Sequence, residues 1–90
     1  MKATVEISMY PFNQDFIPPI KSVIAGFNTY PNIDVITTAT STQLFGDYDE
    51  VMDCVKIELK KSFEQYGFAV FVAKILGRDV REPFTDLKES

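Results

Sequence analysis

The chain has 90 residues, of which 46% are hydrophobic and 24% are charged, so it suits one compact domain and is neither a disordered nor a highly charged segment. Its 13 acidic and nine basic residues give a net charge of −4, and the basic residues are scattered, so we expect no nucleic-acid-binding surface. With no histidine and one cysteine, Cys54, the sequence lacks the usual ligands of zinc, copper, haem and iron–sulfur sites, and we expect no cofactor.

The sequence contains no apolar run approaching the roughly 18 to 20 residues of a membrane span. The longest candidate, residues 68–72, is followed closely by Lys74. Residues 1–2 lead directly into an alternating segment rather than an apolar signal region, and a single cysteine permits no disulfide within the chain. These features predict a soluble, cytoplasmic protein with no membrane partner.

Residues 3–10 alternate in polarity, which predicts a first strand. One face would carry Ala3, Val5, Ile7 and Met9, and the other Thr4, Glu6, Ser8 and Tyr10. After Pro11, a segment with helical spacing carries apolar residues at Phe16, Ile20, Val23, Ile24 and Phe27. Pro18 and Pro19 should lie in its first turn, where a missing N–H costs little, and residues 28–32 should end it.

Residues 33–39 are rich in β-branched side chains and predict a second strand, which returns through a tight turn at residues 40–41 into a third strand at 42–45. Gly46 should close that strand, and Asp47 should be the N-cap of a second helix. That helix should bury one face, formed by Tyr48, Val51, Met52, Val55, Leu59, Phe63 and Tyr66. Gly67 suits its C-terminal end, and residues 68–76 predict a fourth strand.

The order β-α-β-β-α-β is typical of the ferredoxin-like α+β sandwich, in which two helices cover one face of a four-stranded antiparallel sheet. Right-handed crossovers then give the strand order 4-1-3-2. We therefore expect one domain at residues 1–76, followed by a charged C-terminal tail at residues 77–90.

The fourth predicted strand is apolar on both of its faces, so burying one face under the helices leaves the other exposed. The simplest cover for this open face is the same face of a second copy, and we expect a homo-oligomer. The tail is a candidate for the interface, and a second contact through Val80 and Phe84 would favour a tetramer over a dimer.

The sequence offers little for catalysis. No nucleophile–base pair can be built without histidine, Cys54 is best explained as a small buried thiol, and Glu6 is the one acid in the middle of a strand on the open face. The four glycines are spread singly, so no phosphate loop is present. The acylphosphatases share this topology, but residues 11–15 lack the arginine that they need in the first loop. We expect no enzyme activity.

A cluster of hydrogen-bonding side chains spans residues 37–43, with the sequence TTATSTQ, and aromatic residues follow it. Hydroxyl and amide groups beside aromatic rings can recognise a small heteroaromatic ligand. A threonine-rich edge hairpin selected only for β-propensity explains the same pattern, and the residues alone leave both interpretations open.

Residues 7–11 (ISMYP) and 40–51 (TSTQLFGDYDEV) resemble the YkoF-like thiamine/hydroxymethylpyrimidine-binding family. Its members begin with an I-S-x-Y-P strand and carry S-T-x-x-x-G-D-x-D-x-V between the third strand and the second helix. The resemblance extends over residues 5–76. It implies a ferredoxin-like domain, in the single-domain form that assembles by packing of sheets, which binds thiamine or its pyrimidine without known catalysis.

The resemblance also implies ligand contacts on the first strand and around the hairpin, at Ser8, Tyr10, Thr40, Ser41, Thr42, Gln43 and Asp47. Aromatic stacking on the ligand would come from Tyr10, Phe12, Phe45 or Tyr48. For Gly46 and Asp47 a chain reversal and an N-cap are sufficient explanations without any ligand.

The sequence therefore favours non-catalytic binding of thiamine or its hydroxymethylpyrimidine moiety in a homo-oligomer. One alternative is an oligomerising structural or regulatory module that has retained no ligand. Another is an enzyme of the cofactor-free dimeric α/β barrel type that acts on an aromatic substrate, against which the absence of histidine argues.

Overall fold

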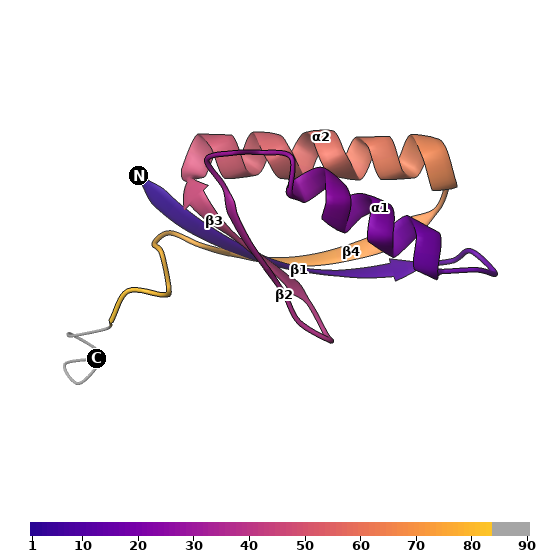
Figure 1. The fold of residues 1–90 in the computed structure, drawn as a ribbon, viewed down its shortest axis with the longest axis horizontal. Helices are drawn as coiled ribbons and strands as arrows, with labels where there is room; N and C mark the ends of the chain where they lie inside the picture. Colours follow the sequence, from indigo (N-terminus) through magenta and orange to yellow (C-terminus); the bar gives the residue numbers. More distant parts are fainter. Residues whose placement is uncertain (84–90) are drawn as a thin grey trace.

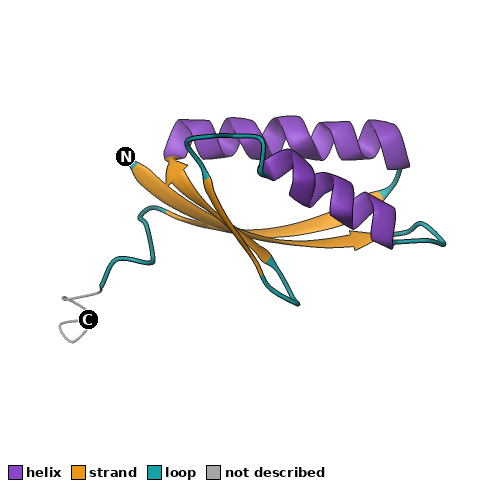
Figure 2. Ribbon diagram, viewed as in Figure 1, coloured by secondary structure: helices purple, strands orange, loops and turns teal. Residues whose placement is uncertain are grey.

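The computed structural model describes residues 1–83 and contains one four-stranded antiparallel sheet with both helices on one face (Figures 1 and 2). The elements in chain order are β1 (Lys2–Pro11), α1 (Ile17–Phe27), β2 (Asp34–Thr37), β3 (Thr42–Asp47), α2 (Tyr48–Tyr66) and β4 (Ala69–Leu76). The strands are arranged in the order β2-β3-β1-β4, which confirms the predicted ferredoxin-like α+β fold and its 4-1-3-2 strand order.

The central strand β1 shows the predicted alternation. Ala3, Val5 and Ile7 are buried on the face that carries the helices. Val5 and Ile7 belong to the main core, together with Val23, Phe27, Ile33, Leu44, Val51 and Cys54. The opposite face of the sheet carries Glu6, Ser8 and Tyr10, which remain partly or largely exposed. We call this second surface the open face.

Helix α1 begins where the prolines predict. Pro18 and Pro19 occupy its first turn, where their missing N–H groups leave no helical bond unmade. At the other end, the side chain of Asn28 donates to the carbonyl of Ile24 at 2.8 Å and satisfies one terminal acceptor.

Helix α2 is capped at both ends as expected. The Asp47 carboxylate accepts hydrogen bonds from the N–H groups of Asp49 (3.1 Å) and Glu50 (3.4 Å). Gly67 follows the last turn with a positive φ of 85°, which glycine adopts without the strain that a side chain brings.

The buried face of α2 agrees with the prediction in part. Val51 is buried and Met52, Val55 and Leu59 pack against the core as expected. Cys54, Glu58 and Ser62 are also buried, whereas Tyr48 and Phe63, which the sequence placed on this face, are exposed. The reason is close packing against α1: the Glu58 carboxylate occupies the space that a side chain at Gly26 would need, and it accepts a hydrogen bond from the Tyr30 hydroxyl at 2.7 Å.

The hairpin between β2 and β3 also departs from its predicted bounds. Strand β2 ends at Thr37, and the connection comprises residues 38–41 rather than only 40–41. The Thr38 hydroxyl accepts hydrogen bonds from the N–H groups of Thr40 and Ser41, which turns the chain before β2 can continue. Strand β3 runs on through Gly46 to Asp47, because Gly46 is still paired with Ala3 of β1.

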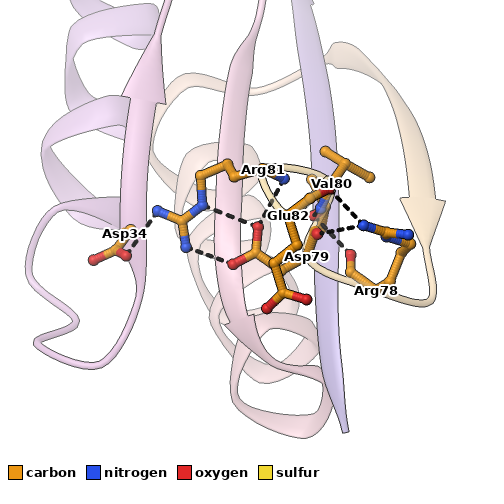
Figure 3. A network of polar contacts seen from close by, with 7 residues as sticks. Asp34, Arg78, Asp79, Val80, Arg81 and Glu82 are labelled. Atoms are coloured by element: carbon orange, nitrogen blue, oxygen red, sulfur yellow. Dashed lines mark hydrogen bonds and ion pairs between the residues drawn. The ribbon is translucent and has the colours of Figure 1, made fainter. Parts of the chain in front are cut away.

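The chain after β4 returns across the open face. Residues 78–82, which we call the strap, are fixed by the Thr4 hydroxyl, which donates to the carbonyl of Arg78 (2.8 Å) and accepts from the N–H of Val80 (3.1 Å). The Arg81 guanidinium lies 4.1 Å from the centre of the Phe45 ring and forms ion pairs with Asp34 (2.9 Å) and Asp79 (2.7 Å) (Figure 3). The expected interface role of the tail stays a prediction, and Phe84 lies outside the described residues.

Candidate ligand-binding site

A cavity of about 120 Å³ lies where the β2–β3 hairpin separates from β1. Pairing between β1 and β3 ends at Ile7 and Thr42, and beyond that pair the hairpin tip points away from β1 and β4 (Figure 1). Helix α1 contributes to the wall. The residues that line the cavity are Ile7, Ser8, Met9, Ile20, Val23, Ile24, Phe27, Thr37, Thr38, Ala39, Thr40, Ser41, Thr42 and Phe71.

One part of the lining is apolar. Ile20, Ile24 and Phe27 lie on successive turns of α1, and Phe71 of β4 adds a second ring from the sheet. Such a wall can cover the faces of a small ring, which themselves need no hydrogen bonds.

The other part is a rim of hydroxyl groups. The Ser8 hydroxyl donates to the backbone carbonyl of Thr40 at 3.1 Å, and the Ser41 hydroxyl donates to the Glu6 carboxylate at 3.1 Å. The Thr37 and Thr42 hydroxyls, 3.4 Å apart, share one hydrogen bond. The cavity therefore combines an apolar wall with several polar groups on one side, as small-molecule sites commonly do.

Glu6 connects this rim to the open face. One carboxylate oxygen accepts from Ser41, and the other lies 3.4 Å from the ammonium group of Lys74 on β4. The hydrogen bond from Ser41 lowers the pKa of Glu6 below its ordinary value, and Lys74 acts in the same direction. The group is therefore ionised at neutral pH and can only accept hydrogen bonds.

Four of the residues expected at the site line this cavity: Ser8, Thr40, Ser41 and Thr42. Gln43 lies next to the site but on the open face, where it pairs with Glu6. Tyr10 is on the same face, two residues beyond Ser8, and 56% of it is exposed.

Phe45 and Asp47 are not brought to the cavity. They lie near the other end of β3, where Phe45 is buried under Arg81 and Asp47 serves as the N-cap of α2. The hydrogen bond from the backbone of Glu50 lowers the pKa of Asp47.

The aromatic residues expected to stack on a ligand also lie elsewhere. Phe12 stacks on Phe68, with 4.7 Å between ring centres, and Tyr48 begins α2. The aromatic rings that line the cavity are instead Phe27 and Phe71. Their apolar spacing identified them as core residues, but only the tertiary structure reveals that they border a cavity.

Other kinds of site are not found in the part of the chain that the structure describes. Residues 1–83 contain no group of three or more histidine, cysteine, aspartate or glutamate side chains that could hold a metal ion. Among the same residues, neither helix is long and apolar enough to cross a lipid bilayer.

Comparison with known proteins places this fold and its cavity in context. The family model described as the YKOF-related family matches residues 2–75, a span that contains both helices, all of the sheet except the last residue of β4, and the whole cavity lining. The chain belongs to the YKOF-related family. Membership confirms the resemblance that the two sequence motifs indicated. No curated protein matches the chain.

Solved structures of similar proteins share the fold over nearly their whole length. A protein from Streptococcus pneumoniae is 26% identical with a TM-score of 0.82, and 99% of this chain and 98% of that one are covered. A hypothetical protein from Methanocaldococcus jannaschii is 27% identical with a TM-score of 0.75, and the match covers 97% of this chain and 91% of that one. A Thermotoga maritima protein, assigned provisionally to thiamine biosynthesis or salvage, is 20% identical with a TM-score of 0.78, covering 98% and 95%.

Proposed function

We propose that the cavity binds the aminopyrimidine ring of thiamine or of its hydroxymethylpyrimidine precursor, without catalysing a reaction. The observation that carries this proposal is the meeting of Ser8, Thr40, Ser41 and Thr42 at one cavity beside an apolar wall. These hydroxyls come from the two sequence motifs that resemble thiamine-binding members of the family. The provisional assignment of the Thermotoga protein to thiamine biosynthesis or salvage supports the same ligand class.

The chemistry of the lining matches such a ring. Phe71 and the isoleucines of α1 can cover its faces, and the hydroxyl rim can bond to the amine and ring nitrogens at its edge. In thiamine the attached thiazolium is a cation, and a protein of net charge −4 attracts it.

The absence of catalysis is part of the proposal and rests on the state of the reactive groups. Burial raises the pKa of the Cys54 thiol to about 12, so it is not a ready nucleophile. Glu6 is engaged by Ser41 and Lys74 rather than poised to abstract a proton. We also propose a cytoplasmic location, which a single buried cysteine fits.

Calorimetric titration with thiamine and with hydroxymethylpyrimidine tests the binding proposal. We expect saturable heat from at least one of them below about 1 mM, which corresponds to roughly −4 kcal/mol. The variant Ile24→Phe, which adds volume to the apolar wall, should abolish that heat.

The matched control is Ile57→Phe, the same substitution at an exposed site on α2 that does not line the cavity. It should bind as the unchanged protein does. Absence of heat from both ligands with the unchanged protein would overturn the proposed function.

The open face favours a homo-oligomer as the second part of the proposal. Beyond the strap, Tyr10 of β1 and Val70 and Val72 of the neighbouring strand β4 are between 40% and 56% exposed on the open face. Ile36 of β2, 43% exposed, lies on the same face but is separated from β1 by β3. A second copy would cover this apolar surface with an identical one. If ligand binding fails and assembly remains, the protein is an oligomerising structural or regulatory module.

A further inference from the structure

Three of the hydroxyl groups at the rim of the cavity, those of Ser8, Thr38 and Ser41, have protons that are already committed to hydrogen bonds. Ser8 bonds to the carbonyl oxygen of Thr40, and Thr38 bonds to the carbonyl oxygen of Ser41 at 3.2 Å. Ser41 bonds to the Glu6 carboxylate. A carbonyl and a carboxylate can only accept, so in all three bonds the hydroxyl must be the donor.

Thr38 has no remaining capacity for a ligand. Besides donating to Ser41, its oxygen accepts two hydrogen bonds, from the N–H groups of Thr40 (3.3 Å) and Ser41 (3.2 Å). A hydroxyl has one proton and two lone pairs, so Thr38 is fully used in holding the hairpin turn.

Ser8 and Ser41 differ from Thr38 in this respect. Within residues 1–83 neither hydroxyl oxygen accepts a hydrogen bond, so each keeps its lone pairs for a ligand. The two serines are also neighbours: Ser8 follows Ile7, Ser41 precedes Thr42, and Ile7 and Thr42 are the last paired residues of β1 and β3. Both residues line the cavity, and their side chains lie on its open-face side, so they present acceptors close together at that edge.

We propose that Glu6 is a positioning residue that keeps the Ser41 hydroxyl an acceptor towards the cavity. The cavity then selects a ring that bears an exocyclic N–H donor over a ring that bears a carbonyl at the same place. By holding the Ser41 proton on the open-face side of the sheet, Glu6 turns Ser41 into an acceptor towards the cavity. The inference rests on the proposed function and adds to it which edge of the ligand is read and by which groups.

Glu6 is suited to this role by its surroundings. Lys74 lies 3.4 Å from the second carboxylate oxygen, and Gln43, the strand partner of Glu6, also lowers the pKa of this carboxyl. Both keep the carboxylate in the charged form, which accepts and never donates. The Thr37 and Thr42 hydroxyls have two protons and use one of them in the hydrogen bond between them, so the other can be donated to a ring nitrogen.

The test measures the ratio of two affinities, for hydroxymethylpyrimidine and for its analogue in which a ring carbonyl replaces the exocyclic amine. A mismatched hydrogen bond in a covered site costs about 1–3 kcal/mol, so the unchanged protein should prefer the amine by about tenfold to a hundredfold. In Glu6→Gln the new amide can donate to Ser41, which frees the Ser41 proton to face the cavity. The preference should then shrink or reverse.

Two further variants make the result specific. Lys74→Gln changes a charge on the same surface but leaves the Glu6 to Ser41 bond in place, so the preference should persist. Ser41→Ala removes the acceptor itself and should lose the preference even if Glu6→Gln does not fold, with folding followed by circular dichroism.

The outcomes separate the two claims. Equal affinity for the two rings, or a preference that survives both Glu6→Gln and Ser41→Ala, overturns the inference and leaves the proposed function standing. Failure of the unchanged protein to bind either ring or thiamine overturns the proposed function and the inference with it.

Discussion

Glu58 and Gly26 illustrate how one pair of residues can set the packing of two helices. A carboxylate buried to this degree is costly unless it is bonded, and Glu58 is bonded by the Tyr30 hydroxyl (2.7 Å) and by Lys61 (3.3 Å). Burial and the bond to Glu58 raise the pKa of Tyr30 to about 12, so the phenol keeps its proton and remains a donor. Gly26 supplies the space in which the carboxylate lies.

We therefore expect Gly26→Ala to be destabilising. In an ordinary helix this change gains about 0.5–1 kcal/mol, but here the new methyl group would displace Glu58 from Tyr30. The lost hydrogen bond costs about 1–3 kcal/mol, so after that gain the net loss should be up to about 2 kcal/mol of the free energy of unfolding, measured by urea denaturation.

Gly77→Ala is the matched control, because a methyl group there would meet only the Met1 side chain at 3.6 Å, an ordinary contact. This variant should leave the midpoint of urea denaturation nearly unchanged. In a Glu58→Ala background the effect of Gly26→Ala should largely vanish, and an undiminished effect in that background would contradict the explanation.

At the scale of elements, the strap is held to the sheet by the Thr4 hydroxyl and by an ion pair from Arg81, which Asp79 of the strap itself holds in place. The Arg81 side chain bonds to Asp34 of β2 and twice to Asp79 (Figure 3). It also lies over the ring of Phe45 on β3. The hydrogen bonds from Arg81 lower the pKa of Asp79 from 3.8 to about 2. Because the pKa is depressed in the folded state, this carboxylate favours the attached strap above its ordinary pKa and ceases to do so as the pH falls.

The strap should therefore loosen between pH 3.8 and about pH 2. Hydrogen exchange at the N–H of Val80, which bonds to Thr4, reports its attachment. We expect protection at this amide to fall over that interval, and to be low and nearly independent of pH there in Asp79→Asn. Equal pH dependence in Asp79→Asn and in the unchanged protein would show that another group controls the strap.

At the scale of the whole molecule, the strap divides the open face into two parts. At one end, Thr4 and Phe45 are buried under it. At the other end, Val70 and Val72 of β4 pair with Tyr10 and Ser8 of β1 and stay exposed. Covering apolar surface yields about 25 cal/mol for each Å², so the second part is where another copy gains most from docking.

We expect Val72→Lys to reduce the mass seen by light scattering from an oligomer to the 10.2 kDa of one chain. The charge would have to be desolvated at the proposed interface. Ile75→Lys is the matched control, because Ile75 is on the same strand and 54% exposed, against 56% for Val72, but it points to the other face of the sheet. A monomeric mass for the unchanged protein at millimolar concentration would disprove the assembly.

The order of elements followed from local signals in the sequence. Alternation in residues 3–10, the prolines at 18 and 19, the N-cap at Asp47 and the glycine at 67 each act within a few residues of chain, and all four were confirmed. The fold class and strand order followed from those elements, because right-handed crossovers leave few arrangements. Family motifs added the hydroxyl residues at Ser8 and 40–42, which proved to share one cavity.

Contacts between residues distant in the chain were decided only in the tertiary structure. On the buried face of α2, Val51, Met52, Val55 and Leu59 were predicted correctly, but the burial of Glu58 was not, because the space at Gly26, 32 positions before Glu58, has no local signal. The bond between Thr4 of β1 and Val80 of the strap, and the bond from Ser41 to Glu6, likewise have no local signal in the sequence. Sequence periodicity indicates which side of a helix or strand is apolar. Which side chains come into contact depends on how the helices and strands pack. This packing determines the candidate site and the direction of its hydrogen bonds.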